Sequence, residues 1–124
     1  MASVTKTAQV DLQSGRVAGP WPAELGNLPA LQRLELRNNI NLTSLPAELG
    51  NLTALQSLDL RNCRLTSVPA ALGRLTKLKS LDLSSNKLTS VPAELGGLSA
   101  LTRLELSDNP GLVGTAGWIV LATS

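Results

Sequence analysis

The sequence of 124 residues contains no His, no Phe and no Tyr, and it has one Cys, one Met and two Trp. Without His there is no imidazole to act as a general base, so catalytic pairs of Ser or Cys with His are excluded, as are zinc sites that use His. One Cys cannot form an internal disulfide or a Cys-rich metal cluster. The shortage of aromatic rings also argues against the platforms on which single-stranded nucleic acids stack.

The apolar residues that remain are aliphatic. Hydrophobic residues make up 43% of the chain although aromatic residues make up only 2%. The length corresponds to one domain. A core of this size built from Leu, Val and Ala indicates a repeated unit rather than an irregular globule.

The sequence contains no membrane-spanning or secretory signal. No segment approaches the run of about 20 apolar residues that a transmembrane helix needs. The first residues, Met1 to Thr7, include a cation but no apolar run behind it, so they do not form a signal peptide. These features predict a cytoplasmic protein, or an extracellular one if a leader was removed. Asn41 and Asn51 stand in Asn-Leu-Thr triplets, which we interpret as products of the chain's composition rather than as glycosylation sites.

A unit of constant length repeats along the chain. Leu31, Leu55, Leu78 and Leu101 follow one another at steps of 24, 23 and 23 residues. After each comes a phrase of Leu, an acidic residue and Leu, at 34–36, 58–60, 81–83 and 104–106. Three residues beyond each phrase stand Asn39, Cys63, Asn86 and Asn109. A phrase of Leu or Val, Pro, two further residues, Leu and Gly follows at 45–50, 68–73 and 91–96.

This pattern resembles the leucine-rich repeat family, whose repeats are about 20 to 29 residues long. The Leu-Pro-x-x-Leu-Gly phrases are most similar to the intracellular Ras-group repeats, whereas the first unit, with Gly19-Pro20-Trp21-Pro22, resembles the plant receptor type. The resemblance implies an α/β solenoid of about five repeats, shaped as a short horseshoe arc. It has a parallel β-sheet on its concave face and short helical or 3-10 turns on its convex face.

Each part of the repeat has a physical reason. The two leucines of each phrase lie on one face of a short strand, and stacked neighbours bury that face. The Asn side chain hydrogen-bonds backbone groups where the chain leaves the strand. Pro46, Pro69 and Pro92 are expected at the first position of the short helical segments, and the glycines that follow are expected to end them.

The whole chain, 1–124, is expected to form a single domain. It divides into an N-terminal tail at 1–6, repeats at 7–112 and a C-terminal cap at 113–124. Trp118 is expected in the cap, where it would cover the last layer of leucines, and Trp21 is expected as a core filler near the other end.

The polar residues that flank the strand leucines form the candidate binding site on the concave face, because period-two spacing turns them outward together. Arg favours bidentate contacts and is common at binding hot spots. The candidate protein-binding residues are Gln9, Asp11, Gln13, Arg33, Glu35, Arg37, Asp59, Arg61, Asp82, Arg103 and Glu105.

The acidic members of this set could be taken for catalytic carboxylates or for a cation site. We interpret them instead as a column of ordinary strand residues, one per repeat, which the neighbouring arginines neutralise. We therefore expect no enzymatic activity, no cofactor and no metal. The basic stretch between residues 61 and 87 has six cations and one anion. These residues fall on several sides of the solenoid, so we expect neither nucleic-acid binding nor membrane insertion.

The resemblance implies a non-enzymatic module that binds a partner protein through the concave face, in signalling or scaffolding. The alternative is a structural or engineered, self-assembling repeat scaffold with no external ligand. The near identity of the Leu-Thr-Ser-Leu-Pro and Leu-Thr-Ser-Val-Pro phrases is consistent with that alternative, although natural repeat arrays also arise by recent duplication. The open ends of a solenoid could also pair with a second copy.

Overall fold

The computed structural model describes residues 9–12, 25 and 27–112. In this part of the chain, short strands alternate with 3-10 helices after the second strand. The elements are β1 (Gln9–Asp11), β2 (Arg33–Glu35), η3 (Ala47–Asn51), β3 (Ser57–Asp59), η4 (Ala70–Arg74), β4 (Ser80–Asp82), η5 (Ala93–Gly97) and β5 (Arg103–Glu105). Gln13, Trp21, the tail at 1–6 and the cap at 113–124 lie outside the described residues.

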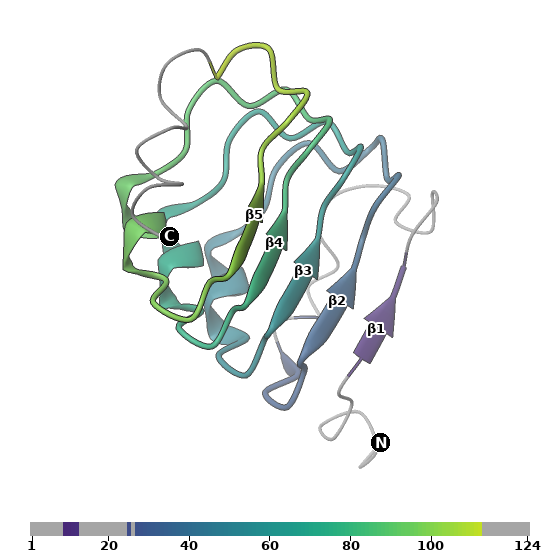
Figure 1. Cartoon of the computed structure of the whole chain (residues 1–124). Coiled ribbons are helices and arrows are strands. Elements are labelled where there is room, and N and C mark those ends of the chain that lie inside the picture. Colours follow the sequence, from purple (N-terminus) through teal and green to yellow (C-terminus); the bar gives the residue numbers. More distant parts are fainter. Residues whose placement is uncertain (1–8, 13–24, 26, 113–124) are drawn as a thin grey trace.

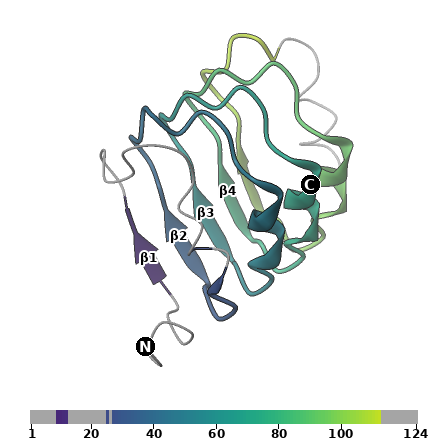
Figure 2. The same ribbon diagram turned by 180° about the vertical axis from the view of Figure 1, so that it is seen from behind.

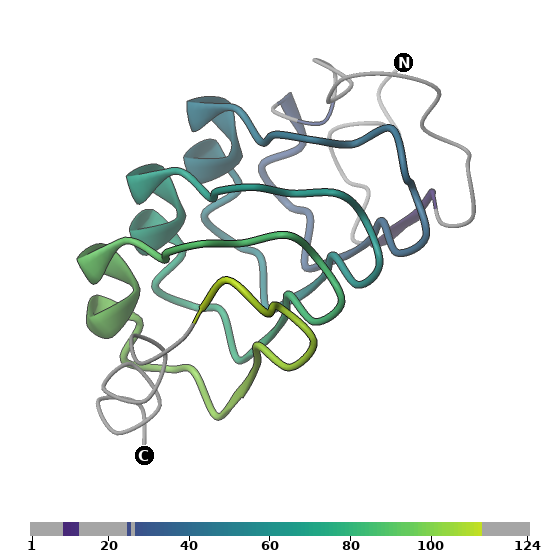
Figure 3. The same ribbon diagram turned by 90° about the horizontal axis from the view of Figure 1, so that it is seen from above.

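The strands form one parallel sheet in the order β1-β2-β3-β4-β5, so each repeat pairs with the next (Figure 1). The register is the same throughout: each central hydrophobic residue lies opposite its counterpart, from Val10 and Leu34 to Leu81 and Leu104. The view from behind shows the 3-10 helices on the side of the coil opposite the strands (Figure 2). Seen from above, successive coils stack with their 3-10 turns aligned (Figure 3). The fold class predicted from the repeat is confirmed.

Leucines fill the space between the strands and the 3-10 turns. Leu34 and Leu36 of one repeat are fully buried, and so are Leu81 and Leu83 of another, because the period of two directs each pair inward. The column contributed by the helical segments is equally buried, at Leu49, Leu72 and Leu95. Leucine repeated in each coil therefore makes a continuous core. This explains why the chain needs so few aromatic side chains.

The prolines lie one position earlier than predicted. Pro46, Pro69 and Pro92 precede the 3-10 helices with extended backbone, at ψ values of 163°, 151° and 147°. Each proline carbonyl accepts the first hydrogen bond of its turn, for example from the N–H of Leu49 at 3.2 Å. The ring thus fixes the entry into the turn rather than occupying the turn's first residue.

The glycines also differ from the prediction, because they lie inside the 3-10 helices rather than ending them. A Cβ on Gly50 would lie 2.9 Å from the carbonyl oxygen of Ala71 in the next turn, and a Cβ on Gly73 would lie 2.8 Å from Cβ of Glu94. Glycine is therefore needed for the close approach of successive 3-10 turns.

The predicted column of amide side chains is confirmed. Asn86 is 5% exposed, and its Nδ2 donates to the carbonyl oxygens of Leu60 and Leu83 at 2.9 and 3.0 Å. Asn109 makes the equivalent bonds one repeat later. In place of Asn, Cys63 directs its Sγ to the carbonyl oxygen of Leu36 at 3.3 Å. These bonds satisfy carbonyls that the turn would otherwise bury without partners.

Candidate functional site

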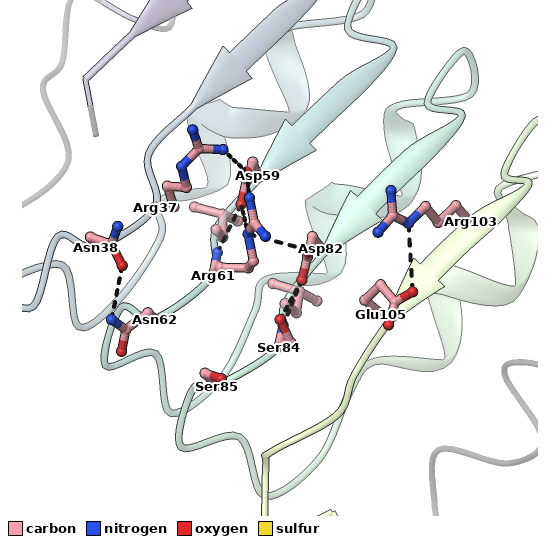
Figure 4. Close-up of polar contacts among 12 residues, drawn as sticks. Arg37, Asn38, Asp59, Arg61, Asn62, Asp82, Ser84, Ser85, Arg103 and Glu105 are labelled. Carbon is pink, nitrogen blue, oxygen red and sulfur yellow. Dashed lines mark hydrogen bonds and ion pairs between the residues drawn. The ribbon is translucent and has the colours of Figure 1, made fainter. Parts of the chain in front are cut away.

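The concave face presents three rows of side chains that run across the strands. The row at the strand starts comprises Gln9, Arg33, Ser57, Ser80 and Arg103. Two residues along each strand lies the acidic row, made of Asp11, Glu35, Asp59, Asp82 and Glu105. Beyond the strand ends, the third row comprises Arg37, Arg61 and Ser84 (Figure 4), followed in the last repeat by Ser107. The structure therefore brings together all the predicted site residues that it describes.

Asp59 lies at the centre of an ion-pair network (Figure 4). Its Oδ2 accepts from Nη1 of Arg37 and from Nη2 of Arg61, both at 3.0 Å, and its Oδ1 accepts from the Arg61 backbone N–H at 3.2 Å. The network continues to Asp82, whose Oδ2 lies 3.5 Å from Nε of Arg61. One carboxylate thus holds two guanidinium groups from neighbouring repeats.

This arrangement shifts the acidity of the groups involved. Burial by itself would raise the pKa of Asp59, but the hydrogen bonds from the Arg61 side chain and backbone and from Arg37 outweigh it. The pKa of Asp59 consequently lies below its ordinary value. The same hydrogen bond with Asp59 raises the pKa of Arg61. Both groups remain charged near neutral pH.

The remaining charges on the face are paired less completely than predicted. Ser84 donates its Oγ–H and its N–H to Oδ1 of Asp82, at 2.6 and 3.0 Å. Arg103 reaches Glu105 of its own strand through Nε at 3.5 Å. Arg33, which was expected to neutralise a carboxylate, has no ion pair or hydrogen bond from its guanidinium to any described residue.

A cleft of about 580 Å³ opens on this face. Besides the predicted residues, it is lined by Gln32, Gln56 and Lys79, which the sequence reasoning missed. Each of them precedes a strand, and its carbonyl oxygen accepts from two successive N–H groups of the next repeat. Gln56 and Ser57, for example, both donate to the Gln32 oxygen, at 2.8 and 3.0 Å. Where two hydrogen bonds share one carbonyl, the alternation of side chains is interrupted. Two consecutive residues, such as Gln56 and Ser57, then both line the cleft on the concave face.

A second hollow, of about 630 Å³, lies on the side where the chain leaves the strands. Its lining includes Ile40, Arg64, Lys87 and Pro110. Ile40 is half exposed and is the one large hydrophobic side chain on the surface of the described residues. It belongs to one of the two turns that are a residue longer than the others.

Within the described residues, no group of three or more Cys, Asp or Glu side chains is arranged to hold a metal ion. None of the helices in that same part is both long enough and apolar enough to cross a membrane.

The comparisons with known proteins agree with this architecture. A family model described as a leucine-rich repeat region matches residues 18–111, so the chain belongs to the leucine-rich repeat family. Comparison with curated proteins finds no match.

Among solved structures, a leucine-rich repeat protein of Leptospira interrogans is similar, with a TM-score of 0.76 and 36% identity over 83% of this chain and 26% of that one. The leucine-rich repeat ectodomain of the plant membrane receptor kinase GASSHO1/SCHENGEN3 of Arabidopsis thaliana is also similar. That structure, a complex with CASPARIAN STRIP INTEGRITY FACTOR 2, gives a TM-score of 0.76 and 37% identity over 85% of this chain and 13% of the receptor. PEPR1, in its structure with AtPEP1, gives a TM-score of 0.75 and 36% identity over 82% of this chain and 15% of that one. The chain thus spans about a quarter or less of these relatives' length.

Proposed function

We propose that this protein is a non-enzymatic module that binds a partner protein through its concave face. The observation that carries the proposal is a polar cleft whose floor is the parallel sheet and whose edge holds Arg33, a guanidinium with no ion pair to any described residue. Two similar structures are complexes, of GASSHO1/SCHENGEN3 with CASPARIAN STRIP INTEGRITY FACTOR 2 and of PEPR1 with AtPEP1. Their likeness to this chain supports protein or peptide recognition as its role.

The rigidity of the face favours binding. The leucines beneath it, such as Leu34, Leu58 and Leu81, are at most 1% exposed, so the strands lie on a close-packed core. The ion pairs around Asp59 fix two of the arginines before any partner arrives. A partner therefore meets a surface that is already ordered, which reduces the entropy lost on binding.

The proposal is tested by capture of partners from an extract of the source cells. The double variant Arg33→Glu/Arg103→Glu reverses two charges that border the cleft, and neither side chain is buried. The matched control, Arg74→Glu/Lys77→Glu, makes the same change in net charge at exposed positions in η4 and in the loop after it. We expect the concave variant to lose the captured protein and the control to retain it. Equal capture by both variants would show that the concave face is the wrong surface.

The alternative, a self-assembling scaffold, stands on the near identity of the repeats and on the two edge strands of the described sheet, β1 and β5. Light scattering coupled to size exclusion separates the two readings. Assembly predicts a mass that grows with concentration, whereas the binding module predicts the 13.0 kDa monomer throughout.

A further inference from the structure

The charges on the concave face are sorted into rows rather than mixed. Arg33 and Arg103 lie in the row at the strand starts, and Lys79 precedes β4 at the same edge. We call these three residues the cation row. The described part of this edge contains no acidic side chain, whereas the carboxylates lie two residues further along each strand, about 6.6 Å away.

The cation row is available to a ligand in a way that the other arginines are not. Arg37 and Arg61 are held by Asp59 at 3.0 Å. In contrast, neither Arg33 nor Lys79 has a side-chain hydrogen bond or ion pair to a described residue. Arg103 is 63% exposed and uses only Nε in its contact with Glu105.

The distance between the two arginines of the cation row sets the spacing of the ligand groups that can bind both. Arg33 on β2 and Arg103 on β5 are separated by three strand spacings, which is about 14 Å at about 4.8 Å per strand. An extended peptide advances about 3.3 Å per residue, so residues four apart are about 13 Å apart and point to the same side. Between the two arginines the floor carries only the short side chains of Ser57 and Ser80. The amides of Gln32 and Gln56, which line the same cleft, can bond a peptide backbone.

We propose that the cation row binds an extended, acidic segment of a partner protein in which two carboxylate side chains stand four residues apart. This proposal rests on the proposed function and specifies its ligand. The segment crosses the strands from β2 to β5, with one carboxylate on Arg33, the other on Arg103, and Lys79 between them at the edge. A bidentate contact with each guanidinium fixes the register of the peptide.

The neighbouring acidic row distinguishes a peptide from a continuous polyanion. Nucleic acid and anionic membrane surfaces carry closely spaced charges, some of which would lie against Glu35, a carboxylate with no ion pair to any described residue, and be repelled. A peptide with two separated carboxylates places its charges on the cation row alone. Its intervening uncharged residues pass over the serine floor.

The test is a chemical-shift titration of the full chain, labelled with nitrogen-15, with synthetic twelve-residue peptides of Gly and Ser that contain two Glu. One peptide has the Glu residues at positions i and i+4, and its control has them at i and i+3. We expect the first peptide to bind about fivefold more tightly, with amide shifts concentrated at 32–33, 56–57, 79–80 and 102–103.

Arg33→Gln/Arg103→Gln should abolish this preference, and the matched control Arg74→Gln/Lys77→Gln should retain it. Equal affinity for the two peptides, no shifts at millimolar peptide, or tighter binding of a single-stranded oligonucleotide would overturn the proposal. If the peptide preference is absent while partner capture still depends on Arg33 and Arg103, the spacing rule alone is wrong. If capture does not depend on them, the proposed function itself fails.

Discussion

The N–H groups that follow the column of Asn residues are satisfied in two different ways. In the short turns, Leu65 N–H donates to Oδ1 of Asn86 in the next repeat, at 3.1 Å, and Leu88 N–H uses Asn109 in the same manner. In the longer turn that contains Ile40, Leu42 N–H donates instead to the carbonyl oxygen of Asn39 in its own turn, at 3.0 Å. The inserted residue therefore removes the need for an amide oxygen at position 63, and Cys is tolerated there.

This arrangement predicts that exchanging Asn for Cys at position 86 and exchanging Cys for Asn at position 63 have unequal effects on stability. Asn86→Cys leaves the buried N–H of Leu65 without its acceptor, which should cost about 1 to 3 kcal/mol of unfolding free energy. It also replaces strong N–H donors to Leu60 and Leu83 with a weak thiol donor. Cys63→Asn offers an amide oxygen to the Asn39 backbone N–H in place of the sulfur and adds donors for the Leu36 carbonyl, so we expect a change within about 1 kcal/mol.

Deletion of Ile40 tests directly whether the length of this turn determines which residue is tolerated at position 63. The shortened turn should need an amide oxygen at position 63, so the deletion should cost more in the wild-type chain than in the Cys63→Asn background, by about 1 kcal/mol. Urea unfolding followed by circular dichroism gives the four free energies of this cycle. Equal costs for Asn86→Cys and Cys63→Asn, or a coupling of zero between the deletion and Cys63→Asn, would refute the reasoning.

Three further perturbations test other parts of the structure. Gly73→Ala should destabilise the protein by about 1 to 3 kcal/mol because its Cβ would lie 2.8 Å from Cβ of Glu94, whereas Gly97→Ala, with no atom within 4 Å, should be neutral or stabilising in the same urea assay. The lowered pKa of Asp59 means that its ion pairs stabilise the fold above about pH 4 and that this contribution is lost as the pH falls through the folded pKa. Wild type should therefore lose more unfolding free energy than Asp59→Asn between pH 7 and pH 2.5, and parallel losses would contradict this account. Burial raises the pKa of the Cys63 thiol, so a water-soluble disulfide reagent at pH 7.5 should label it slowly in the native protein and rapidly in urea. Equally rapid labelling in both conditions would show that the thiol is accessible.

The fold was predictable because it depends on periodicity. The Leu-acid-Leu phrases determine the positions of the strands and their register. A shift of one residue in the strand pairing would direct Leu34 or Leu58 toward solvent. The Asn column follows from the same alignment. The positions of Pro46 and Gly50 were predicted to within one residue, but their roles were not, because these depend on the stacking of successive turns rather than on one turn alone.

The site was predictable only in outline. Sequence spacing placed Arg33, Arg37 and Arg61 on one face, but it could not show that two of them bind Asp59 while Arg33 has no partner among the described residues. That difference depends on which long side chains reach across to the next strand. Gln56 and Lys79 were missed because strict alternation turns them away from the face. The carbonyl oxygens of Gln32, Gln56 and Lys79, each shared by two N–H groups of the next repeat, break that alternation and are visible only in the structure.

The central claim, that partners bind the concave face, is tested most directly by site-specific photocrosslinking. A photoreactive residue replaces Ser80 on the floor of the cleft in one variant and exposed Ala93 in η5 in another. Each is irradiated in an extract of the source cells, and the adducts are identified by mass spectrometry. We predict a discrete adduct with one partner from position 80 and none from position 93. An adduct at position 93 without one at position 80 would contradict the account.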